Sequence, residues 1–309
     1  DFHARLETTL KVLGAAKAVR GSRIGLVGGG IVPKFNDLDL SEAERNRLEQ
    51  AWDIRFVTIP LDEVLARAKA IPAGDAEKEA SRQAAGYAEN RVGCEAVKEQ
   101  ARLVLALRAI RDEKNQAALA IRCWPEFQTQ AKFWPCGAIG HLCDAGIPTA
   151  CEGDPVGALD MLLASKLSTQ PSTLLDIIDF DDQRDTLSVW HCGPTAPSCA
   201  ACGKVSLLPH AVDGADESGK PRFGHPAIHD LNLRPGPVTI LRTLGALDDE
   251  FCLDAEILPE DGERVTGSFG KAGRLRAYGR PVRAAEARDR ILTDGIPHHY
   301  TVFYREEVK

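Results

Sequence analysis

Apolar and polar positions alternate in two different periods along the first part of the chain, and the two periods predict two kinds of element. β-Strands are expected over RIGLVGGG, IRFVTIP and AALAIRCW, and helices over SEAERNRLEQAW and LDEVLARAKA. An amphipathic helix is expected over residues 1–20, ending before Gly21, and a long, largely polar helical stretch from about Asp75 to Asp112. Strands that alternate with helices are typical of parallel β-α units.

The second part of the chain continues this pattern and then changes. A short strand is expected to end at Ala150, a helix to begin at Pro155, and strands to follow over STLLDII and TLSVWHCG. From about Gly203 the sequence becomes rich in Gly and Pro, with short strands over PVTILRTL and FCLDAEIL. The predicted class is α/β: parallel-sheet α/β units over residues 1–115 and 116–202, then a β-rich subdomain over 203–309, a small barrel or sandwich.

The length and the net charge of the chain limit the classes of protein to which it can belong. A chain of 309 residues is long enough for about two domains. The formal net charge of -7, without a clustered basic surface, argues against a nucleic-acid partner and favours a small metabolite such as a sugar. No apolar run reaches the roughly 18 to 20 residues of a membrane span, so a cytoplasmic protein is expected. Because the chain starts at Asp1 in a helical pattern, we expect a fragment or a processed chain.

Candidate metal ligands fall at or near the predicted strands. Glu152 follows one strand, Asp176 lies inside the next, His191 ends a third, and His298 and His299 form a pair near the end of the chain. Carboxylates with one or two imidazoles suit Mn²⁺, Mg²⁺ or Co²⁺. Structural alternatives stay open, since Asp176 would also suit a helix N-terminus and His191 a hydrogen-bonded core.

Asp154 and the cysteines allow other interpretations. Asp154 before Pro155 is typical of a helix N-cap, which needs no catalytic role. Nine cysteines, an odd number, indicate mostly reduced, buried thiols. The C-x-x-C pair Cys199 and Cys202, with His210 after it, would suit a zinc knuckle or a redox pair, although a second C-x-x-C is missing.

Five short motifs occur in a fixed order: CEGD, LLDI, VWHCGPTAP, GPVTI and PHHYTVF. In this order they resemble the C-terminal half of the L-fucose and L-arabinose isomerases, and the resemblance extends over most of the chain. It implies an aldose-ketose isomerase that uses a divalent metal, usually Mn²⁺. It also implies a homo-oligomer, a trimer or hexamer, whose active sites are completed by neighbouring subunits. The family also has an N-terminal α/β domain, which we expect to be missing ahead of Asp1.

The resemblance also implies roles for the candidate ligands. Glu152 matches a glutamate that binds the metal and acts as an acid/base group, and Asp176 matches the second acidic ligand. His299 matches the metal-binding second histidine of the HH motif, and His191 matches the histidine ligand of the arabinose type. His298 would then lie beside the metal and help to bind the sugar.

RCWPEFQ resembles the tryptophan-bearing strand of the same family, and the resemblance implies that Trp124, Glu126 and Gln128 line the sugar pocket. Aldose-ketose isomerisation through an enediolate needs a base and a group that stabilises the negatively charged enediolate oxygen. The sequence leaves open whether Glu152 or Asp176 is the base. The sugar also stays open among L-fucose, D-arabinose and L-arabinose. The alternatives are a related metal-dependent epimerase or lyase, and a non-catalytic sugar- or zinc-binding protein.

Overall fold

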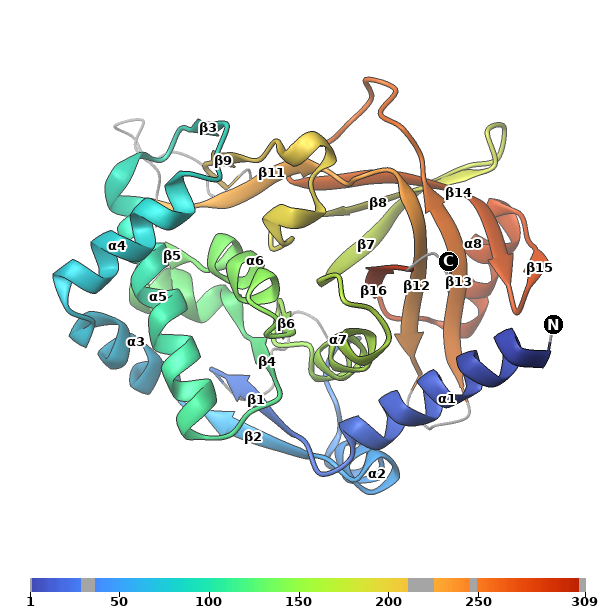
Figure 1. Cartoon of the computed structure of the whole chain (residues 1–309), viewed down its shortest axis with the longest axis horizontal. Helices are drawn as coiled ribbons and strands as arrows, with labels where there is room; N and C mark the ends of the chain where they lie inside the picture. Colours follow the sequence, from blue (N-terminus) through green and yellow to red (C-terminus); the bar gives the residue numbers. More distant parts are fainter. Residues whose placement is uncertain (1, 29–36, 211–224, 245–248, 306–309) are drawn as a thin grey trace.

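Two sheets, one parallel and one closed into a barrel, dominate the structure, a computed structural model that describes residues 2–28, 37–210, 225–244 and 249–305. Figure 1 shows the parallel strands and their helices on one side of the molecule and the barrel on the other. The predicted α/β class with a β-rich C-terminal region is therefore confirmed.

The parallel sheet has the strand order β2-β1-β4-β6. Its strands are β1 (Arg23–Val27), β2 (Arg55–Ile59), β4 (Ala118–Ile121) and β6 (Thr149–Ala150). Every pairing in it is parallel, which requires a crossover connection between neighbouring strands. The helices of this half are α2 (Glu42–Trp52), α3 (Leu61–Ala70), α4 (Ala73–Ala84), α5 (Gly93–Glu113) and α6 (Cys136–Asp144). Helix α1 (Phe2–Val19) precedes β1 and runs below the barrel in the view of Figure 1.

The barrel closes because β14 pairs with β13 as well as with β8, in the order β13-β12-β16-β7-β8-β14. Its strands are β7 (Ser172–Asp181), β8 (Thr186–His191), β12 (Gly236–Thr243), β13 (Glu250–Ile257), β14 (Ser268–Ala277) and β16 (His299–Tyr304). Every pairing around the barrel is antiparallel. Closure removes the exposed edges that an open sheet would leave.

Shorter elements extend these sheets. Beyond β14 the sheet continues through β11 (Ile228–Asn232), β9 (Ser206–Leu208) and β3 (Glu89–Asn90). The others are β5 (Phe133–Trp134), β10 (His225–Pro226), β15 (Arg280–Pro281), α8 (Ala284–Asp294), the π-helix η1 (Cys123–Ala131) and the 3₁₀ turns η2 (Pro197–Cys199) and η3 (Ala201–Gly203).

Helix α7 (Pro155–Leu167) lies between the two sheets. It contacts β1, β4 and β6 of the parallel sheet and β7, β12 and β16 of the barrel (Figure 1). The helix is buried on nearly all sides, which explains its almost uniformly apolar sequence. The start of α7 therefore brings the carboxyl end of β6 against the barrel strands.

Two expectations about element limits are wrong. The long helical stretch expected from Asp75 to Asp112 is divided into α4 and α5, because Asn90 Oδ1 accepts hydrogen bonds from the backbone of Val92 and Gly93 and β3 pairs with β9. The strand expected over AALAIRCW ends at Ile121, and the π-helix η1 follows it.

Helix α1 forms where it was expected, and Gly21 beyond it has the left-handed φ of +75°. However, Leu10 and Leu13 are about three-fifths exposed instead of packing into the core. Among the described residues, no helix has both the length and the apolar character needed to cross a membrane. The division into residues 1–115, 116–202 and 203–309 stays a prediction.

Candidate metal centre

The loop between β6 and α7 carries the sequence CEGD, and its backbone is strained at Glu152. Glu152 has a φ of +57°, in the left-handed region that costs a non-glycine residue about 1 to 2 kcal/mol. Gly153 follows with a φ of +70°, and a Cβ placed there would lie 3.3 Å from Cβ of Arg122. Strained backbone of this kind is concentrated at functional sites, and here it presents a carboxylate beyond the end of β6.

Asp154 ends the loop and makes three contacts in a fully buried position. Its Oδ1 accepts the backbone N–H of Gly157 at 2.8 Å, so the predicted N-cap of α7 is confirmed. Its Oδ2 contacts Nη1 of Arg242, which is also buried, and lies 3.1 Å from Nδ1 of His299. Burial would raise the pKa of Asp154, but Arg242 and His299 hold it well below its usual range.

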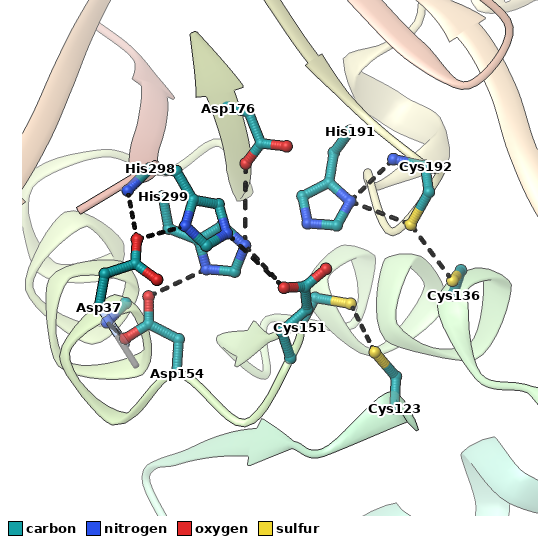
Figure 2. A network of polar contacts seen from close by, with 12 residues as sticks. Asp37, Cys123, Cys136, Cys151, Asp154, Asp176, His191, Cys192, His298 and His299 are labelled. Carbon is teal, nitrogen blue, oxygen red and sulfur yellow. Dashed lines mark hydrogen bonds and ion pairs between the residues drawn. The ribbon is translucent and has the colours of Figure 1, made fainter. Parts of the chain in front are cut away.

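Two neighbouring barrel strands bring the second acid and a histidine together. Asp176 on β7 and His299 on β16 are direct cross-strand partners, and Nε2 of His299 lies 3.8 Å from Oδ1 of Asp176. The same nitrogen lies 3.7 Å from Oε2 of Glu152. His191, at the end of β8, has its ring centre 5.3 Å from that of His299. Figure 2 shows Asp176, His191, His298 and His299 pointing toward a common region.

Four buried atoms in this cluster have no hydrogen-bond partner among the described residues: Oε2 of Glu152, Oδ1 of Asp176 and Nε2 of both His191 and His299. Separations of 3.7 and 3.8 Å are too long for hydrogen bonds, but they suit ligands that each lie about 2 Å from one cation. An unpaired buried polar atom costs about 1 to 3 kcal/mol, so four that converge need a common partner. The donor set fits a divalent metal.

The metal-ligating atoms fall into two overlapping groups. Glu152, His191 and His299 form one, and Asp176, His298 and His299 form the other, with the ligand atoms of each group within 4.8 Å of one another. The two groups share His299. The structure therefore brings together all five residues that the sequence predicts around a metal.

His298 lies at the rim of the cluster and is held from two sides. Its Nδ1 lies 2.5 Å from Oδ2 of Asp37, and its Nε2 lies 3.7 Å from Oε2 of Glu152. Burial would lower the pKa of His298, but these two carboxylates raise it to about 9. Burial would raise the pKa of Glu152, but His298, His191 and His299 lower it.

His191 is oriented by the residue that follows it. Its Nδ1 lies 2.8 Å from the backbone nitrogen of Cys192 and 3.1 Å from the sulfur of Cys192. The backbone N–H of Cys192 donates to Nδ1, so Nδ1 is an acceptor, and the other ring nitrogen, Nε2, is directed into the cluster. Burial lowers the pKa of His191, which favours the neutral ring that a metal needs.

The three predicted sugar-contacting residues belong to η1, next to β4. Glu126 pairs with Arg122 at 2.9 Å, and the amide of buried Gln128 donates to the carbonyl of Cys123 over 3.4 Å. These contacts lie within the β4-η1 segment and do not join either residue to the metal-ligating groups. The side chain of Trp124 lies outside the described part of the structure.

Two residues of the site were not among those predicted from the sequence. Asp37 lies in a polar loop and Arg242 in a β-strand, and each reaches its partner only through the tertiary fold. The sole indication for Arg242 is a charge inside the apolar run VTILRTL, because a strand residue in such a run must find a buried partner.

The C-x-x-C pair does not form a site with His210 in the described structure. Cys199 is buried with its sulfur 3.8 Å from the carbonyl of Pro171, whereas Cys202 is exposed. His210 instead approaches two other cysteines, Cys136 and Cys192.

Comparisons with known proteins point to one activity. No protein-family model matches the chain. The chain is 28% identical over 313 residues to the sulfoquinovose isomerase of Alkalicoccus urumqiensis, covering 99% of this chain and 65% of that relative. It is 27% identical over 243 residues to the sulfoquinovose isomerase of Priestia megaterium, covering 77% of this chain and 51% of the relative. A sulfoquinovose isomerase of a Clostridium species is 32% identical over 166 residues, 50% of this chain and 37% of the relative.

The chain thus spans roughly half to two thirds of the lengths of the first two of these relatives. All three carry the name of an isomerase that acts on a sugar. Similarity to sugar isomerases agrees with the class of enzyme that the five sequence motifs indicate.

Proposed function

We propose that this chain carries the metal site of an aldose-ketose sugar isomerase. The observation that supports this most strongly is the convergence of four buried, unpaired ligand atoms from Glu152, Asp176, His191 and His299. Two carboxylates beside imidazoles match the needs of the reaction, which moves a proton between C1 and C2 of an open-chain sugar. The names of the relatives support the same reaction class.

The proposed cofactor is Mn²⁺, with Mg²⁺ or Co²⁺ as alternatives, held by Glu152, Asp176, His299 and His191. When bound, the cation would act as a Lewis acid that stabilises negative charge on the sugar oxygens. Oxygen-rich sites with one or two imidazoles suit these ions, whereas a thiolate site would select softer metals.

Other steps of the reaction are assigned to residues of this chain. One carboxylate, Glu152 or Asp176, takes the proton from the sugar carbon and returns it to the neighbouring carbon, so the intermediate is an enediolate. Asp154 holds the His299 ring through Nδ1, so that Nε2 faces the two carboxylates. Asp37 holds His298 at the rim, where its ring is placed to contact the hydroxyl groups of a sugar beside Glu152.

The substrate and the assembly form part of the same proposal. Sulfoquinovose, the sugar named by the relatives, is the first substrate to test, and L-fucose, D-arabinose and L-arabinose follow from the family resemblance. We propose Trp124, Glu126 and Gln128 as further sugar contacts. We also propose a cytoplasmic homo-oligomer, a trimer or hexamer, in which neighbouring subunits complete each site.

The test compares turnover of these sugars by the natural full-length polypeptide and by its Glu152→Gln and Asp176→Asn variants. Glu256→Gln, on barrel strand β13, serves as the matched control. We expect both site variants to lose turnover while keeping the circular dichroism spectrum of the wild type, and the control to stay active. Full activity of either site variant would refute the assignment of that carboxylate.

Deuterium exchange tests the reaction itself. In deuterated water, an enediolate route introduces solvent deuterium at C1 or C2, because the base exchanges its proton with solvent. A ketose product with such a label supports the proposal. An epimer or cleaved fragments would instead identify an epimerase or a lyase, which use the same metal and base.

A further inference from the structure

Four free cysteines lie directly behind the candidate metal centre: Cys123, Cys136, Cys151 and Cys192. The sulfurs of Cys136 and Cys192 are 3.8 Å apart, and those of Cys123 and Cys151 are 3.5 Å apart (Figure 2). The proposed isomerase chemistry uses none of these sulfurs.

His210 completes a set of ligands around one of these pairs. Nitrogen of His210 and the sulfurs of Cys136 and Cys192 all lie within 4.8 Å of one another. The His210 ring is itself fixed, because it stacks on Trp134 with 3.6 Å between the ring centres. Two thiols and an imidazole that converge from separate parts of the chain are a typical partial zinc site.

The distance between the two sulfurs agrees with a tetrahedral metal. With a metal–sulfur distance of about 2.3 Å, two thiolates at the corners of a tetrahedron lie about 3.8 Å apart. Cys136 and Cys192 show this separation, whereas a disulfide would need about 2.0 Å between the sulfurs.

We propose that Cys136, Cys192 and His210 form a second metal site that binds a thiophilic divalent cation of the zinc class. The two sites differ in chemistry: carboxylates and imidazoles favour Mn²⁺ or Mg²⁺ in the first, and thiolates favour zinc in the second. This inference rests on the thiol and imidazole geometry and does not depend on the isomerase activity.

The thiolate site adjoins one of the segments that carry the first site. Cys192 directly follows His191 at the end of β8. Cys136 begins α6, and His210 follows β9. A cation at the thiolate site would therefore fix the backbone next to His191, whose Nδ1 accepts the backbone N–H of Cys192.

Cobalt provides a probe that reports sulfur ligands directly. The reduced full chain is stripped of metal and titrated with Co²⁺, which gives a thiolate-to-cobalt charge-transfer absorption only when sulfur binds the ion. We expect this absorption, displaced by stoichiometric Zn²⁺, in the wild type and in Glu152→Gln. We expect its loss in Cys136→Ser and in Cys192→Ser, and no change in the control variants Cys199→Ser and Cys202→Ser.

Several results would overturn the proposal. Absence of the charge-transfer absorption in the wild-type protein would refute the second metal site. This result needs no variant, so the test remains valid even if a variant fails to fold. Loss of the absorption in a folded Glu152→Gln variant would show that the sulfur-bound ion needs that carboxylate and that the two sites are not separate. Persistence in a folded Cys136→Ser or Cys192→Ser variant would exclude the assigned sulfurs.

Discussion

Replacing Asp154 by asparagine removes one charge from a fully buried ion pair and keeps the shape of the side chain. The carbonyl oxygen of the introduced asparagine can still accept the Gly157 N–H, so the N-cap of α7 is retained. Arg242, only 2% exposed, is left without its carboxylate partner. His299 loses the negatively charged acceptor of its Nδ1 proton.

The loss of stability expected for Asp154→Asn follows from the burial of both Asp154 and Arg242. Removing one partner of a buried pair destabilises a protein by about 3 to 5 kcal/mol, because the other charge stays buried and uncompensated. Asp154→Ala removes the cap as well, which adds about 1 kcal/mol. The double variant Asp154→Asn with Arg242→Met is expected to lose less stability than the sum of the single variants, since neither charge is then left alone.

Urea unfolding with a chelator present measures this effect without a contribution from metal binding. Glu113→Gln is the control, since it removes one charge from the exposed Arg67–Glu113 pair and is expected to leave the midpoint unchanged. Separately, metal affinity of Asp154→Asn is expected to fall by roughly 10- to 100-fold, because His299 loses its supporting acceptor. If Asp154→Asn lost less than about 1 kcal/mol of stability, the charge of Arg242 would not depend on Asp154 as proposed.

Two further predictions concern acid sensitivity and the CEGD loop. Burial lowers the pKa of His229 to about 4, beside Tyr87 and His141, so its folded pKa lies below the unfolded value of 6.5. The neutral ring contributes about 3 kcal/mol to stability above pH 6.5, and this contribution is lost as the pH falls toward 4. In His229→Gln the urea midpoint should therefore depend less on pH between 6.5 and 4. Gly153→Ala should destabilise more than Gly146→Ala. Both glycines have a left-handed φ, +70° and +74°, which strains an alanine by about 1 to 2 kcal/mol, but of the two only a Cβ at position 153 meets a neighbour, Cβ of Arg122. Equal midpoints for the two alanine variants would contradict the importance of that contact.

The local parts of the fold could be predicted from the sequence because they depend on neighbouring residues. Apolar periodicity indicated β7, β8 and α7, and Asp154 before Pro155 indicated the start of α7. The end of β6 indicated Glu152 as a candidate ligand, since loops beyond strand ends carry ligands in α/β proteins, and the family resemblance added Asp176 and His299.

Features that depend on distant contacts could not be predicted. The break between α4 and α5 is stabilised by the pairing of β3 with β9, and closure of the barrel depends on the pairing of β13 with β14. The Arg242 contact with Asp154 and the approach of His210 to Cys136 and Cys192 likewise join segments far apart in the chain. Sequence spacing favoured Cys199 and Cys202 instead, because a C-x-x-C pair is visible locally and a site assembled by the fold is not.

Isothermal titration calorimetry of Mn²⁺ into the metal-free chain measures whether Glu152, Asp176 and His299 bind one ion. We expect one ion per chain in the wild type and in Glu256→Gln. In Glu152→Gln, Asp176→Asn and His299→Ala the affinity should fall by more than the roughly 10- to 100-fold expected when a residue only supports a ligand. Unchanged Mn²⁺ affinity in all three folded variants would contradict the proposed metal centre.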